Sequence, residues 1–117
     1  MKYMLFCCNE EKKLDAMSES EMGAVMDETY AYIEELRNSG HYITSERLQP
    51  VAMATMVRVR NGKLSTTDGP FAETKEQVGG FWIIDARDLN EAIQIASKFP
   101  SARLGGIEVR PLRELKA

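Results

Sequence analysis

The sequence predicts an α+β fold of the ferredoxin-like, split βαβ type, with an antiparallel sheet and two helices on one of its faces. Three observations support this prediction. Two strand-like segments are apolar on both sides, two amphipathic segments carry helix caps, and the expected order is strand–helix followed by strand–helix–strand. Right-handed crossovers place both helices on the same face. At 117 residues, the chain is expected to form one domain, residues 1–117.

Two expected strands, residues 2–8 and 78–85, should occupy the middle of the sheet. In the first, alternation places Tyr3, Leu5 and Cys7 on one face and Met4, Phe6 and Cys8 on the other. In the second, Phe81 and Ile83 oppose Trp82 and Ile84. A strand that is apolar on both faces is typical of a central position, where both faces are covered.

Two helices are predicted from caps and spacing. The first spans residues 18–39, because Ser18 and Glu21 form a capping-box pattern and Gly40 provides a stop. The second begins after Asp88, a favourable N-cap residue, and is expected to stop at Pro100.

The remaining strands are shorter. Strands are predicted at residues 41–48 and 107–112. A hairpin is predicted around the Asn61-Gly62 pair, with strands at residues 55–60 and 63–67. This dipeptide favours a type I′ turn, which matches the twist of paired strands.

Two helices on one face leave the other face of the sheet uncovered. Because its central strands are apolar there, we expect a second copy of the chain to cover it in a two-fold homodimer. The alternative is that part of this face lines a ligand cavity.

Composition excludes several classes of function. The net charge of -3 and scattered basic residues argue against nucleic-acid binding. The apolar start of the chain is too short for a membrane span, so a cytoplasmic location and no membrane partner are expected. Adjacent Cys7 and Cys8 are poorly placed to form a disulfide, and with one histidine the chain lacks a structural zinc set. No metal or other cofactor is predicted.

The segment Asp68 to Glu76, DGPFAETKE, resembles the signature of the YCII-related "DGPF" family, and Gln77 to Phe81 continues it. The resemblance extends over nearly the whole chain and implies the dimeric α+β barrel fold. Most members of that family have no assigned reaction, and many are encoded beside extracytoplasmic-function sigma factors. Some YCII relatives resemble lyases or dehydrochlorinases with a His/Asp pair whose histidine comes early, whereas no histidine precedes residue 41 here.

Asp68 and His41 are the candidate catalytic residues. Burial of Asp68 beside Phe71 would raise its pKa toward that of a general acid or base. The alternative is an Asx-turn, in which the carboxylate accepts backbone N–H groups. His41 is the only imidazole available, and the alternative is a favourable interaction with the preceding helix dipole.

Candidate ligand-binding residues are Phe71, Glu73, Lys75 and Arg58. Phe71 could wall an apolar pocket, while Lys75 and Arg58 could anchor an anionic group. The alternatives are packing for Phe71, a solvated charge run for Glu73 and Lys75, and edge-strand solubility for Arg58.

Three hypotheses follow from these candidates. The first is a lyase or isomerase without a cofactor, acting on a small cyclic or acidic metabolite. The second is a non-catalytic ligand-binding or regulatory module associated with a sigma-factor system. The third is a structural dimer with an empty cleft, in which the signature builds a turn that orders the interface. The sequence does not identify the ligand.

Overall fold

The computed structural model describes residues 1–114 and contains a four-stranded antiparallel sheet in the order β2-β5-β1-β6. Its strands are β1 (Lys2–Asn9), β2 (Tyr42–Arg47), β5 (Gln77–Asp85) and β6 (Gly106–Pro111). The predicted central position of β1 and β5 is therefore confirmed.

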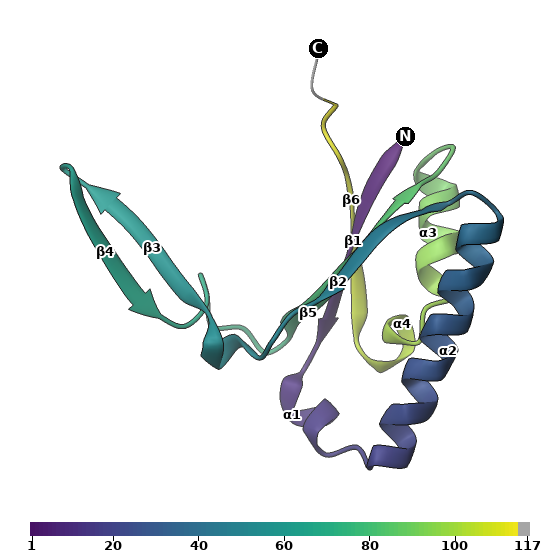
Figure 1. Cartoon of the computed structure of the whole chain (residues 1–117), viewed down its shortest axis with the longest axis horizontal. Coiled ribbons are helices and arrows are strands. Elements are labelled where there is room, and N and C mark those ends of the chain that lie inside the picture. The colour runs from purple at the N-terminus through teal and green to yellow at the C-terminus, as the bar shows by residue number, and fades with distance from the viewer. Residues whose placement is uncertain (115–117) are drawn as a thin grey trace.

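The two main helices, α2 (Glu19–Asn38) and α3 (Leu89–Ser97), lie on the same face of the sheet (Figure 1). The capping box of α2 is present: the Glu21 backbone N–H donates to Ser18 Oγ at 3.0 Å, and the Ser18 N–H donates to Glu21 Oε1 at 3.1 Å. The Asp88 side chain caps α3, because its carboxylate accepts the Glu91 N–H at 2.9 Å. The fold class predicted from these signals is confirmed.

An aromatic cluster joins the sheet to the helices. Trp82 of β5 stacks on Phe99 with ring centroids 4.0 Å apart, and Tyr32 of α2 meets the same ring edge-on at 4.7 Å. The Tyr32 hydroxyl donates to the Ile95 carbonyl oxygen at 2.7 Å, which satisfies its polar group within the core. Burial raises the pKa of Tyr32 to about 12, so the phenol stays protonated and the bond is kept.

Three short elements were not predicted: α1 (Glu11–Asp15), η1 (Val51–Met53) and α4 (Ser101–Leu104). Each is too short to show a helical repeat of apolar residues. The predicted stop of the second helix needs correction, because α3 ends at Ser97 and Pro100 instead stands at the N-cap of α4. Among residues 1–114, no helix is long and apolar enough to cross a membrane.

The predicted hairpin, β3 (Thr55–Arg60) and β4 (Lys63–Asp68), forms a separate two-stranded sheet. Its turn has positive φ at Asn61 and Gly62, 51° and 74°, as a type I′ turn requires. This arm, residues 55–68, projects away from the helices (Figure 1). The radius of gyration is 16.3 Å, whereas about 13 Å is typical of a compact chain of this length.

The face of the sheet opposite the helices is called the open face. Its centre is apolar, because Met4 pairs with Ile83 and Phe6 with Phe81 across the two central strands. All four side chains are partly exposed in the single chain. The row containing the two phenylalanines ends in an acid on each side, since Glu46 pairs with Phe81 and Glu108 with Phe6.

Replacing Gly80 by alanine should destabilise the fold. A Cβ at this position would lie 2.8 Å from the Glu46 carbonyl oxygen, so β2 would have to move away from β5. We expect the free energy of unfolding in urea to fall by about 1–3 kcal/mol. Gly79→Ala is the matched control, because within residues 1–114 no atom beyond its chain neighbours lies within 4 Å of its added Cβ. Equal stability of the two variants would contradict this account of the β2–β5 contact.

Candidate functional site

A cavity of about 430 Å³ lies between α2 and the sheet and is called the helix–sheet cavity. It exists because the two central positions of one row on the helix-facing side of the sheet carry small residues. In that row Cys7 pairs with Gly80, whereas the next row pairs the larger Leu5 and Trp82. Apolar side chains from α1, α2 and β5 supply most of its wall: Leu14, Met22, Val25, Met26, Ile33 and Trp82.

A polar cluster stands on the opposite wall. Cys7 and Asn9 are two residues apart on β1 and therefore share a face, and Ser101 is the first residue of α4. The Asn9 amide donates to Cys7 Sγ at 2.9 Å, and the Cys7 thiol donates to Ser101 Oγ at 3.1 Å. Ser45 and Arg47 of β2 add a hydroxyl and a cation to the cavity lining.

Asn9 is an unusual residue for this position. Its side chain is 5% exposed, and within residues 1–114 its Oδ1 has no hydrogen-bond partner. A Cβ at residue 105 would lie 2.3 Å from this oxygen and from the Cys8 carbonyl oxygen, so only glycine lets the chain pass here. A buried polar group that lacks a partner lowers stability, so this oxygen destabilises the fold.

The thiol in this cluster is a hydrogen-bond donor, not an activated nucleophile. Burial raises the pKa of Cys7 above its ordinary value, and the hydrogen bonds to Ser101 and Asn9 and the charge of Arg47 offset only part of that rise. The thiolate is the reactive form of cysteine, so a raised pKa leaves Cys7 mostly protonated and unreactive near neutral pH.

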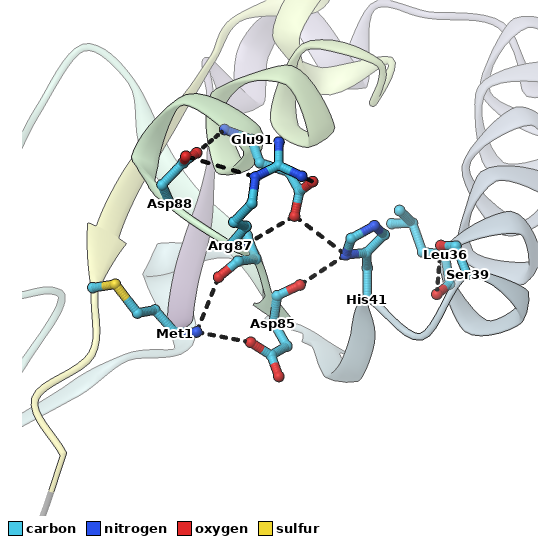
Figure 2. Close-up of polar contacts among 9 residues, drawn as sticks. Met1, Leu36, Ser39, His41, Asp85, Arg87, Asp88 and Glu91 are labelled. Carbon is cyan, nitrogen blue, oxygen red and sulfur yellow. Dashed lines mark hydrogen bonds and ion pairs between the residues drawn. The ribbon is translucent and has the colours of Figure 1, made fainter.

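His41 does not line the helix–sheet cavity. Figure 2 shows it between the end of α2 and the start of α3, where its Nδ1 lies 2.8 Å from the Asp85 carbonyl oxygen and 3.9 Å from Glu91 Oε1. A carbonyl only accepts, so Nδ1 carries the proton in this contact. The Met1 ammonium donates to Asp85 Oδ1 at 3.0 Å beside it. His41, which directly precedes β2, is thus linked to Asp85, the last residue of β5. Its catalytic role stays a prediction.

The signature segment lies at the base of the arm. Asp68 is the last residue of β4 and is exposed, and Phe71 is 79% exposed. The burial of Asp68 beside Phe71 that the sequence suggested is therefore not found in the single chain. Phe71 lines a groove of about 700 Å³, called the signature groove, together with Leu48, Pro50, Met53, Glu76, Val78 and Glu108.

The structure does not bring the other candidate ligand-binding residues together. Lys75 Nζ lies 3.6 Å from Glu10 Oε1, while Glu73 is exposed. Arg58 lies on the arm, opposite Ser65, and no ion pair within residues 1–114 joins it to Glu73. The catalytic role of Asp68 and the binding roles of these residues stay predictions.

Sequence reasoning missed Asn9, Ser101 and Arg47. Both cysteines are free thiols, in agreement with the expectation that these adjacent residues are poorly placed to form a disulfide. One signal was available: Asn9 continues the core-facing series Tyr3, Leu5, Cys7, where a polar residue is out of place. Ser101 and Arg47 could not be found in this way, because they reach the cavity only through tertiary packing.

We expect both cysteines to react slowly with iodoacetamide near neutral pH, because burial raises the pKa of Cys7 and of Cys8 and so lowers the thiolate fraction. Cys7→Ala and Cys8→Ala variants isolate each thiol, and mass spectrometry follows the modification. Each folded variant should react more slowly than the same variant in urea. A folded thiol that reacts faster than its unfolded control would reveal an activated nucleophile and contradict the prediction that burial suppresses the thiolate form.

Comparison with known proteins agrees with this architecture. The family model of the YCII-related domain matches residues 1–116. An uncharacterized protein of Rhizobium meliloti (strain 1021) is 38% identical over 114 residues, which cover 96% of this chain and 92% of that protein. The chain therefore belongs to the YCII-related family, as the DGPFAETKE segment had indicated.

Proposed function

We propose that this protein binds a small, mostly apolar molecule with one acidic or hydrogen-bond-accepting group in the helix–sheet cavity. The observation that carries the proposal is the pairing of an apolar wall from α2 with the Cys7–Asn9–Ser101 cluster on the other wall. Ligand pockets typically measure about 300–1,000 Å³ and combine apolar walls with a few polar groups that orient the ligand. The cavity, at about 430 Å³, fits this description.

The polar residues determine the kind of group that the ligand presents. Ser45 and Ser101 offer hydroxyl donors, and Arg47 offers a planar guanidinium that binds carboxylates with two parallel hydrogen bonds. The Cys7 thiol is protonated and already donates to Ser101. An acceptor such as a carboxylate or a carbonyl oxygen therefore suits this wall better than an ammonium group.

The proposal favours the ligand-binding alternative over a lyase or isomerase. The residues expected to transfer protons, Asp68 and His41, are absent from the set of residues that line the cavity. Asp68 is exposed at the base of the arm, and His41 is engaged with the Asp85 carbonyl oxygen on another side of α2. The carboxylate among the lining residues is Glu46, which pairs with Phe81 and therefore directs its side chain to the open face, away from the cavity.

We further propose that a second copy covers the open face, forming the homodimer expected from the sequence. The support is the partly exposed apolar centre formed by Met4, Phe6, Phe81 and Ile83. Monomeric soluble proteins rarely leave a contiguous apolar patch of several hundred Å² uncovered. A two-fold axis would pair this patch with itself.

Binding should depend on the cavity and on its arginine. With 2-naphthoate and the neutral 2-naphthamide as probes in isothermal titration calorimetry, we expect the acid to bind about fivefold more tightly, a preference worth about 1 kcal/mol. Arg47→Gln should remove the preference, and Val25→Trp should remove binding of both probes by filling the cavity.

Ala24→Trp is the matched control, because Ala24 is the exposed neighbour of Val25 on α2 and does not line the cavity. It should bind like the wild type. Binding that survives Val25→Trp, or the absence of binding by both probes in the wild type, would count against the helix–sheet cavity as the site.

Phe6→Glu should weaken the proposed homodimer, because a carboxylate would have to be buried in each half of the interface. Light scattering over a concentration series should show a dimeric wild type and a mostly monomeric variant. Leu89→Glu, an exposed apolar residue at the start of α3, is the control and should stay dimeric. A monomeric wild type at every concentration would refute the homodimer.

A further inference from the structure

The arm has one apolar face and one basic face. Strand register places Val57 opposite Thr66 and Val59 opposite Leu64 on the first face. Arg58 opposite Ser65 and Arg60 opposite Lys63 form the second. Within residues 1–114 the apolar side chains are largely uncovered: Val57 is 57% exposed, Val59 58% and Leu64 70%.

An arm of this kind is poorly supported by its own contacts. A two-stranded hairpin is marginally stable by itself in water and normally requires further strands or a packed helix. Among the strands of the described part of the chain, β3 and β4 pair only with each other, and the arm points away from the helices (Figure 1). Another surface is therefore needed to cover Val57, Val59 and Leu64.

The signature groove is the complementary surface. It lies beside the open face, since Cys8, Val78 and Glu108 contribute to its lining. Four exposed apolar side chains line it: Leu48, Met53, Phe71 and Val78. Glu76 and Glu108 add negative charge to the same lining.

Charge is divided between the arm and the rest of the chain. The arm contains the basic residues Arg58, Arg60 and Lys63 and the acidic residue Asp68, so its net charge is +2. The whole chain has 15 basic and 18 acidic residues, so the remainder holds 12 and 17 and has a net charge of -5. The long basic side chains can bend around the edges of a narrow ribbon toward acids at the rim of the groove.

We infer that the arm of one copy packs its apolar face into the signature groove of a second copy, and that the second arm does the same in return. The inference rests on the homodimer proposed above and adds to it a reciprocal exchange of arms. It gives the DGPFAETKE segment a role in assembly: Phe71 forms part of the seat for the partner's Val57, Val59 and Leu64. The occupant is a second copy because the chain itself supplies both the basic, apolar arm and the acidic, apolar groove.

The test compares the two faces of the arm. Val59→Glu places a charge on the apolar face, and Ser65→Glu places the same charge on the basic face as a matched control. Because each substitution occurs twice in a symmetric dimer, Val59→Glu should raise the dimer dissociation constant about tenfold or more in light scattering. Ser65→Glu lowers the net charge of the arm by the same amount but leaves the apolar face intact, so it should raise the constant by at most about threefold.

Cross-linking identifies the groove directly. A benzophenone amino acid placed at residue 64, in mixed isotopically light and heavy chains, should yield covalent dimers. Their cross-linked peptides should join one isotope to the other and map to residues 48–54 or 70–78. The same group at residue 65 should give few such products.

The possible outcomes distinguish the exchange of arms from the open-face homodimer on which it depends. A wild type that is monomeric throughout would refute both. A wild-type dimer that Phe6→Glu dissociates but Val59→Glu does not, with no cross-link from residue 64 to the groove, would overturn the arm exchange and leave the open-face dimer standing. Cross-linked peptides that never join a light chain to a heavy chain would place the arm on its own chain and would also overturn it.

Discussion

The pairing of β1 with β5 controls the architecture, because both strands carry large apolar side chains on both faces and must lie at the centre of the sheet. On one face Leu5 and Trp82 receive α2 and α3 and form the core. On the other, Phe6 and Phe81 lie side by side without a helix above them. The same two strands therefore define both the surface that packs against the helices and the apolar open face, which the proposed homodimer would cover.

The helix–sheet cavity arises from a change of residue size along these strands. Where Leu5 and Trp82 pair, the space below the helices is filled, and where Cys7 pairs with Gly80 it is not. Position 80 must be glycine because the Glu46 backbone lies so close to it. The missing side chain therefore allows β2 to pack closely against β5 and also leaves the space that forms the cavity. The cavity also has a polar side, because the residue that follows Cys7 on the same face of β1 is Asn9.

Sequence patterns predicted the fold more completely than the site. Capping at Ser18 and Asp88, the Asn61-Gly62 turn and the alternation in β1 and β5 are local signals, and each corresponds to an observed element. The cavity cluster combines β1, β2 and α4, segments far apart in the chain, so no local pattern reveals it. The sequence candidates Asp68 and His41 have versatile chemistry, but Asp68 is exposed and His41 is hydrogen-bonded to the backbone of Asp85.

The signature segment is best understood through the backbone that it fixes. Gly69 has φ of 107°, which side-chain-bearing residues rarely adopt, and its N–H donates to the Ala54 carbonyl oxygen at 2.8 Å. This bond closes the base of the arm, where Thr55 pairs with Asp68. Pro70 then restricts the chain as it turns into the groove, and Phe71 follows. A short sequence of fixed conformation thus sets the direction of the arm relative to the groove. Reciprocal exchange between two copies requires that relation to be constant, because both arms must reach both grooves at once.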